Sequence, residues 1–317
     1  MRGITVPGPV RLRRLAAAAL LFALTGCGSG QGTPAAPSAF SSALPTRTIA
    51  GAVVPVLPLD GYRLTADQQE RLQQAADRLA TECMRTKGLD WPARPLQAGQ
   101  DHDGNERRYG VSDARTVAAI GYRLPPPSGV TGDQLAEYKK RLDARKAAMS
   151  DTAIAAYTGE KAGATTPQEA GRGGCRGEAT QRLGLPDDLA DNADPVEEAM
   201  QTGWQRTVAD PRAKAADAAW SSCMRTAGFD YPDPHKAAGD PAWRPGAEGV
   251  PASPDARELA VAKKDLDCKR ETGYLTVWQT VEIEQQQALI KEREPSLRQT
   301  LERWRQALAK AEQLLNS

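Results

Sequence analysis

The stretch Glu82-Cys83-Met84-Arg85-Thr86-Lys87-Gly88-Leu89-Asp90-Trp91-Pro92 recurs in the same chain as Ser222-Cys223-Met224-Arg225-Thr226-Ala227-Gly228-Phe229-Asp230-Tyr231-Pro232. The offset is 140 residues, seven of the eleven positions are identical, and an aromatic residue precedes the proline in both copies. A match of this length within one chain is typical of a duplicated supersecondary unit. The sequence therefore predicts a fold with an internal duplication.

Both copies have the pattern of a helix that ends at a glycine. Gly88 and Gly228 suit the left-handed position just after a helix, and the proline keeps the aromatic residue before it out of the helical region. Arg85 and Arg225 would lie in the last turn, where the helix dipole favours cations. We interpret the repeat as a helix-stop and packing motif. The alternative is a ligand site made of the acidic and aromatic residues of both copies, Asp90, Trp91, Asp230 and Tyr231.

The helices that lead into the two motifs have recognisable starts. Thr65 with Gln68 forms a capping box, and Asp210-Pro211 supplies an N-cap followed by proline at the first helical position. Further helices are predicted from Asp133 to Tyr157, from Asp194-Pro195 toward Val208, and from Ser253-Pro254 to Glu271, closed by Gly273. No stretch shows sustained strand alternation. We therefore expect a mainly α-helical fold with long ordered loops.

The cysteines predict disulfides that staple this fold. Five are present, and the four that follow Cys27 allow three pairings. Each unit has one cysteine at its helix end and one further along. Because the units are duplicates, we predict bridges from Cys83 to Cys175 and from Cys223 to Cys268. A metal site is the rival interpretation, but no Cys-x-x-Cys or His-x-x-x-His spacing supports zinc or another metal.

The last segment, residues 274–317, has the pattern of a heptad helix. Apolar residues recur at alternating steps of four and three, at Leu297, Leu301, Trp304, Leu308, Ala311 and Leu315. Pro295 is expected to kink or split this helix. Two arrangements stay open for the seam formed by Leu297, Leu301, Trp304 and Leu308. It packs on the body of the protein, or it meets an envelope protein partner or a second copy of the chain.

The first 26 residues have the three parts of an export signal. Basic residues precede an apolar stretch from Leu15 to Leu24, which is too short to span a bilayer core of about 30 Å. Leu24-Thr25-Gly26-Cys27 then forms a lipobox, the pattern at which a signal peptidase cleaves before a lipidated cysteine. We expect lipidated Cys27 to be the mature N-terminus, with its acyl chains holding the protein on the outer face of the cytoplasmic membrane.

Residues 27–61 are predicted to form a flexible tether followed by an extended arm. The first part is rich in Gly, Ser, Ala and Pro and cannot bury enough surface to order itself. From Ile49 to Leu59 the chain turns apolar, interrupted by Pro55 and Pro58. We expect this arm to lie on the folded body. A docking peptide for another protein is the alternative.

Charge and motifs argue against several classes of function. Lys and Arg total 41 against 40 Asp and Glu, so the net charge of +1 gives no electrostatic case for binding nucleic acid. The sequence signatures of serine hydrolases, zinc proteases and phosphate-binding loops are absent from the sequence. His102 and His235 lie in predicted loops, and nothing in their spacing assigns them a catalytic or metal-binding role. We predict no cofactor and no catalytic residue.

Five short motifs resemble a group of secreted proteins and lipoproteins from high-GC Gram-positive bacteria. They are Pro58-Leu59-Asp60-Gly61-Tyr62, the Cys83-Met84 helix end, Tyr109-Gly110-Val111, Gly121-Tyr122-Arg123-Leu124-Pro125 and Gly173-Gly174-Cys175. The likeness covers most of the chain after Cys27. It implies an extracytoplasmic location and a similar style of fold, but no particular activity.

Together these patterns divide the chain into five parts. They are a lipoprotein signal peptide (1–26), a lipid-anchored tether and arm (27–61), a first helical repeat unit (62–185), a second (186–273) and a C-terminal helix (274–317). We expect a non-enzymatic binding or accessory module, anchored to the membrane and serving a cell-envelope transport system. A ligand-binding sensor or receptor is the alternative, and an enzyme acting on cell-wall polymers is a further one.

Overall fold

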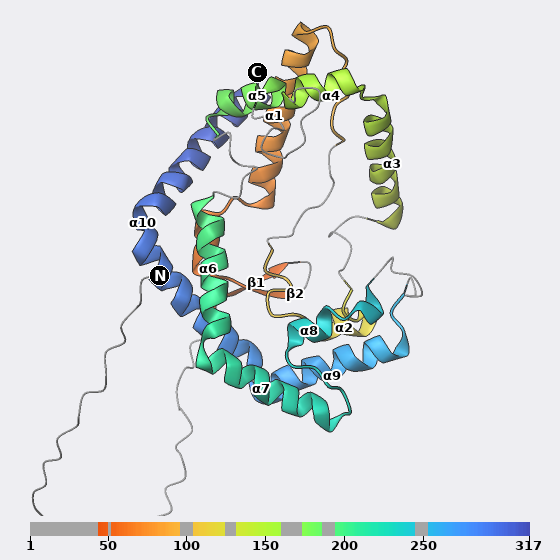
Figure 1. Ribbon diagram of the computed structural model, residues 1–317, viewed down its shortest axis with the longest axis vertical. Helices are drawn as coiled ribbons and strands as arrows, with labels where there is room; N and C mark the ends of the chain where they lie inside the picture. Colours follow the sequence, from red (N-terminus) through yellow and green to blue (C-terminus); the bar gives the residue numbers. More distant parts are fainter. Residues whose placement is uncertain are drawn as a thin grey trace, which may run out of the picture. The chain divides into compact units, whose positions relative to one another are not determined.

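Two helices end at the repeated motif, and each is joined by a disulfide to a later helix (Figure 1). Cys83 at the end of α1 (Ala66–Thr86) bonds to Cys175 in α5 (Gly174–Leu183), and the Cα atoms lie 5.5 Å apart. Cys223 at the end of α7 (Pro211–Thr226) bonds to Cys268 in α9 (Ala256–Thr272), with a Cα separation of 5.7 Å. Both predicted bridges are confirmed.

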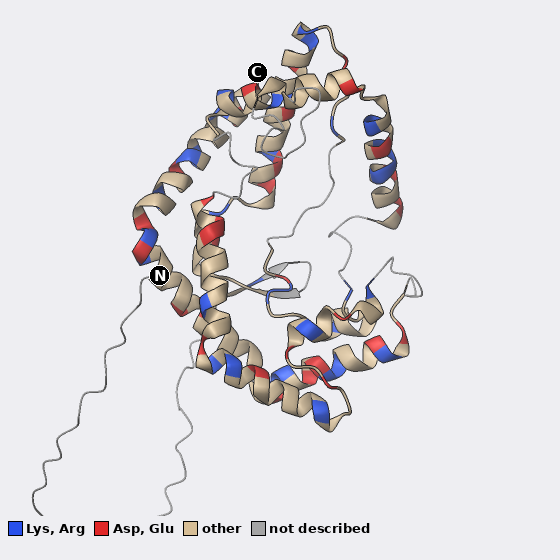
Figure 2. Ribbon diagram, viewed as in Figure 1, with Lys and Arg blue, Asp and Glu red and all other residues tan. Residues whose placement is uncertain are grey.

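The remaining elements are mostly helices. The computed structural model describes residues 44–49, 52–95, 104–123, 131–159, 173–185, 194–244 and 253–317. Within them lie α2 (Ala114–Ile120), α3 (Gly132–Ala148), α4 (Asp151–Thr158), α6 (Pro195–Ala209), α8 (Pro234–Ala238) and α10 (Tyr274–Leu315), with short 3-10 helices η1 (Pro58–Tyr62) and η2 (Pro241–Trp243). The predicted mainly α-helical fold is confirmed. Acidic and basic residues are interspersed along these helices (Figure 2).

The two motifs end their helices in the same way. In each copy the glycine N–H donates to the arginine carbonyl at 3.0 Å. The next N–H donates to the methionine carbonyl, at 3.1 Å for Leu89 and 3.2 Å for Phe229. Gly88 and Gly228 have φ values of +67° and +81°, a conformation that glycine adopts without strain. The repeat is therefore a helix-stop motif, as the sequence predicted.

The N-terminal arm begins with a β-hairpin that the sequence did not predict. Strands β1 (Thr46–Ile49) and β2 (Ala52–Pro55) pair antiparallel, with Thr46 opposite Pro55. Short runs of β-branched residues on both sides favour this pairing. The arm lies on the helices, as expected, because Val54, Leu57 and Leu59 are buried.

The predicted helix from Asp133 to Tyr157 is two helices, α3 and α4. Ser150 separates them, because its Oγ accepts a hydrogen bond from Ala153 N at 3.2 Å and so caps the start of α4. Helix α3 has no fully buried residue. The apolar spacing across the break is therefore not one continuous core-facing stripe.

Two main clusters of buried side chains form around the disulfides. One contains Cys83 and Cys175 with residues of α1, α4, α5 and the end of α10. The other contains Cys223 and Cys268 with residues of α7, α9 and the start of α10. Tyr109, Val117 and Tyr122 pack in this second cluster, although the sequence assigned them to the first unit. The repeat units therefore do not coincide with continuous stretches of chain.

Helix α10 passes both clusters and bends between them. Arg293 has a non-helical φ of −120° two residues before Pro295, so the predicted kink is present. The helix contacts α7 and α9 before the bend, α6 around the bend, and α1 and α5 beyond it (Figure 1). Residues Leu44–Ser317 form one compact unit.

Candidate functional site

A fully buried ion pair joins α9 to its surroundings. Lys269 Nζ lies 3.1 Å from an Asp265 carboxylate oxygen, and neither side chain is exposed. Asp265 also accepts hydrogen bonds from Trp220 Nε1 at 2.9 Å and from Tyr122 OH at 3.2 Å. Lys269 donates to the carbonyl of Val111 at 2.9 Å. The pair therefore connects three separate segments and is satisfied by them.

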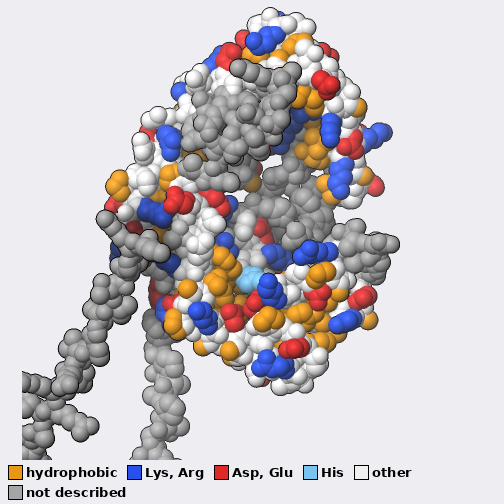
Figure 3. Space-filling model, in the orientation of Figure 1, with side chains coloured by type: hydrophobic (Ala, Val, Ile, Leu, Met, Phe, Trp, Pro, Cys, Tyr) orange, Lys and Arg blue, Asp and Glu red, His pale blue; other side chains and the backbone are white. Residues whose placement is uncertain are grey.

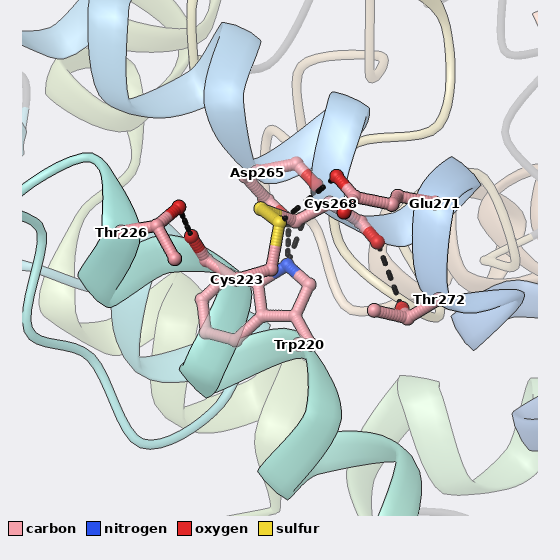
Figure 4. Close-up of a disulfide and its surroundings, with 7 residues drawn as sticks. All are labelled: Trp220, Cys223, Thr226, Asp265, Cys268, Glu271 and Thr272. Carbon is pink, nitrogen blue, oxygen red and sulfur yellow. Dashed lines mark hydrogen bonds between the residues drawn. A yellow bond between two sulfur atoms is a disulfide. The ribbon is translucent and has the colours of Figure 1, made fainter.

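The ion pair lies beside the second disulfide. Figure 4 shows Trp220 and Asp265 next to the bond between Cys223 and Cys268, with Glu271 on the other side. Glu271 Oε2 approaches Cys223 Sγ to 3.4 Å, a close contact because a disulfide sulfur carries no hydrogen to donate. Burial raises the pKa of Asp265 and lowers the pKa of Lys269, and their mutual attraction opposes both shifts.

A second buried carboxylate, Glu282 in α10, holds the turn at residues 105–110. Arg108 donates to both of its oxygens, with Nε at 3.0 and 3.2 Å, and Tyr109 OH donates at 3.0 Å. Gln286 Nε2 donates to the same carboxylate at 3.0 Å, while Gln286 Oε1 accepts from Leu59 N at 3.0 Å. Glu282 thus links the turn to the N-terminal arm.

Aromatic rings gather next to this turn, around Trp278 of α10. The ring centroids of Trp204, Tyr274 and His235 lie 5.3, 5.8 and 6.0 Å from that of Trp278. His235 also meets Trp204 edge-on at 5.1 Å. The guanidinium of Arg108 lies 4.8 Å from the Trp204 ring centroid, within range of a cation–π interaction.

Two titratable side chains in this aromatic group have shifted pKa values. Asp217 accepts from Tyr274 OH at 3.0 Å and Trp278 Nε1 at 3.2 Å, yet burial raises the pKa of this carboxyl to about 6. Burial lowers the pKa of His235, which favours its neutral form. Its Nε2 is buried and has no hydrogen-bond partner. Figure 3 shows histidine surface on this face of the molecule, beside basic side chains.

Arg107 differs from its neighbours because no carboxylate of the described residues pairs with it. Its Nη2 donates to the carbonyl of Arg123 at 2.6 Å. Within the part of the chain that the structure describes, Arg107 forms no ion pair, whereas Arg123 binds Glu258 at 3.1 Å and Arg108 binds Glu282. Burial lowers the pKa of Arg107, and more distant acids only partly offset this effect.

The structure separates the residues of the alternative ligand site. Trp91 packs in the first cluster and stacks on Tyr157 with ring centroids 4.2 Å apart. Tyr231 packs against the second cluster and donates to Asp240 at 2.8 Å. Asp90 and Asp230 are exposed. The two copies of the motif therefore do not form one site.

The C-terminal seam lies on the body of the protein. Leu297 is fully buried against η1 and α6, and Trp304 and Leu308 pack against the first cluster. Leu301 is partly buried. Of the two arrangements that the sequence left open, the structure has the one in which the helix folds back. Cys27 and His102 lie outside the described residues.

Several residues of this site were missed at the level of sequence. Asp265 and Lys269 carried one usable signal, because an acid and a lysine four residues apart share a helix face with Val261 and Ala262, which are buried. Arg108 and Glu282 carried none, since they are 174 residues apart, and Arg107 carried none, since its partner is a backbone carbonyl. No group of three or more potential metal ligands occurs among the described residues.

Comparison with known proteins identifies no relative. No family model matches the chain, and no curated protein and no solved structure shows significant similarity to it. None of the described helices is both long and apolar enough to cross a membrane.

Proposed function

We propose that this protein is a lipid-anchored binding or accessory module on the outer face of the cytoplasmic membrane. The lipobox that ends at Cys27 carries the proposal, because it specifies both export and the anchor. The two disulfides support it, since such bonds form and persist in oxidising compartments and are rare in the cytosol.

A binding role is favoured over catalysis by the way the charged groups are used. The acids Asp265, Glu258 and Glu282 are each engaged by a lysine or arginine and by further hydrogen bonds. Groups held in this way position segments of the chain and are poorly suited to exchanging protons with a substrate. In this proposal the module binds a component of a cell-envelope system without catalysing a reaction. A transport system is the first candidate.

A ligand-binding receptor is the second candidate function. The guanidinium of Arg107 favours it, because it pairs with no carboxylate of the described residues and such a group can take an anionic ligand as its counter-ion. An enzyme acting on cell-wall polymers has no comparable observation in its favour.

The anchor is tested by exchanging the signal. We expect the wild-type chain to incorporate labelled palmitate and to stay with membranes after a salt wash. Cys27→Ala should lose the label. A chain whose residues 1–27 are replaced by an ordinary cleavable secretion signal should be released, because in this proposal the acyl chains on Cys27 are what holds it. Ser29→Ala is the matched control and should behave as wild type. Sedimentation of the exchanged chain with membranes after the wash would refute the anchor.

A further inference from the structure

Arg107 uses part of its guanidinium group to hold the fold, and its side chain is partly exposed. Its Nη2 donates to the carbonyl of Arg123, and its own carbonyl accepts from Gly110 N at 3.0 Å. Within the described residues the bond to Arg123 is the one hydrogen bond of the guanidinium. Donors therefore remain available at a point that the backbone of the turn fixes.

The electrostatic surroundings of Arg107 leave its charge unbalanced. Charged groups removed from water are normally paired, because an unpaired charge keeps its desolvation cost. Asp265 and Asp113 act on Arg107 only at a distance, and Asp265 already binds Lys269. Burial lowers the pKa of Arg107, the direction expected for a cation that lacks a counter-ion.

A second unsatisfied group, in α8, also interacts with Lys269. The turn approaches α8 closely, because a Cβ atom built on Gly110 would lie 2.9 Å from Lys269 Nζ and 3.8 Å from Pro234 Cβ. The next residue, His235, has a buried Nε2 without a partner. Lys269 interacts electrostatically with both His235 and Arg107. A donor edge and an unpartnered imidazole nitrogen thus share one neighbourhood.

We propose that Arg107 is the recognition residue of a site for small oxyanions, with His235 at its edge. A guanidinium binds a carboxylate or a phosphate through two parallel hydrogen bonds, so both ligand types share the chemistry that the free edge offers. The inference rests on the proposed binding role and specifies its ligand class.

Thermal unfolding with matched variants tests the assignment. Phosphate and acetate are compared with chloride at equal ionic strength, using the full mature domain without its lipid. Wild type should melt at a higher temperature in one or both oxyanions, and the more effective anion identifies the ligand type. Arg107→Gln should weaken the apparent affinity by about tenfold or more, since a charged hydrogen-bond partner is lost. Arg115→Gln, an exposed arginine on α2, is the control and should leave the response unchanged.

A spectroscopic readout separates specific binding from general stabilisation by salts. The chain has only two histidines, so NMR can follow both imidazole rings, and His102→Gln assigns the signals. A bound oxyanion should raise the pKa of His235, against the opposing influence of Lys269 and Arg108 and together with Asp233 and Glu282. Arg107→Gln should abolish this shift.

Two results would overturn the proposal. One is an equal response to oxyanions in wild type and Arg107→Gln, and the other is no response beyond chloride in either measurement. Neither result would affect the anchor, which is measured by membrane fractionation and palmitate labelling. Failure of the oxyanion site is therefore distinguishable from failure of the proposed membrane-bound role.

Discussion

At the scale of single residues, buried charged side chains connect segments that are distant in the chain. Lys269 and Asp265 lie on one face of α9, yet their other partners, Tyr122, Val111 and Trp220, come from two distant parts of the chain. A buried ion pair adds little net stability compared with apolar side chains of the same size, but removing one partner leaves an uncompensated charge. Its effect on the fold is therefore asymmetric.

Replacing one member of this pair should be far more costly than replacing both. We expect Lys269→Met to lower the free energy of unfolding by about 3–5 kcal/mol, because Asp265 stays buried without its counter-ion. The double variant with Asp265→Leu should recover much of the loss. Urea denaturation measures both changes, and Lys263→Met, at an exposed position of the same helix, is the control. Equal stability of the single and double variants would contradict the asymmetry.

Asp217 should make the folded protein less stable as the pH rises, the opposite of the usual effect of a carboxylate. Its pKa in the folded protein is about 6, above the ordinary value of 3.8, so the folded state binds its proton more tightly than the unfolded state does. The resulting stabilisation is complete below about pH 4 and is lost as the pH rises through 6.

Asp217→Asn should remove this dependence while keeping an oxygen that accepts from Tyr274 and Trp278. The variant should be more stable than wild type by about 1 kcal/mol at pH 7.5, a value discounted because the carboxyl is half exposed. Near pH 4 the two proteins should be equal. Denaturant titrations at the two pH values compare them, and a variant less stable than wild type at pH 7.5 would show that the carboxylate form is the favoured one.

At the scale of elements, local signals predicted the helices and long-range contacts decided the rest. The caps at Thr65 and Asp210 and the glycines after α1 and α7 act within a few residues, so the sequence specified them correctly. The break at Ser150 was also a local signal, but the apolar spacing across it favoured one helix. The packing of Tyr122 in the second cluster depends on α9, more than a hundred residues away, and no local pattern contains it.

The last arm of α10 tests how much an element contributes through burial. Deleting residues 296–317 removes the fully buried Leu297 and Ala311 and uncovers the part of the first cluster that packs against Trp304 and Leu308. Large apolar side chains contribute about 1.5–3 kcal/mol each when buried, so the loss should approach the 5–15 kcal/mol of a whole domain. The truncated chain should therefore melt far earlier or aggregate. Removing only the exposed Asn316 and Ser317 is the control. An unchanged melting temperature after the long deletion would instead favour the alternative in which the C-terminal seam binds a partner protein or a second copy of the chain.

At the scale of the whole molecule, two disulfide-centred clusters share one long helix. The first cluster contains Cys83 and Cys175 and the second contains Cys223 and Cys268, while α10 contributes buried residues to both. The duplication therefore supplies two similar stapled cores, and the C-terminal helix makes them one unit. If this coupling is strong, the described unit unfolds in a single transition despite having two cores.

Removing each disulfide separately tests that coupling. In the chain-entropy account the bridges close loops of 92 and 45 residues, so each stabilises the fold by about 4–5 kcal/mol, with the longer loop contributing slightly more. We expect Cys83→Ser with Cys175→Ser, and Cys223→Ser with Cys268→Ser, each to lower the midpoint of one shared transition. Trp91 reports on the first cluster, and Trp220 on the second. Because the chain has six tryptophans, each variant should retain a single one, Trp91 or Trp220, and its fluorescence, alongside circular dichroism, should give coincident curves. If one pair of substitutions lowered the midpoint of its own cluster alone, the cores would be independent and α10 would be a connector rather than shared core.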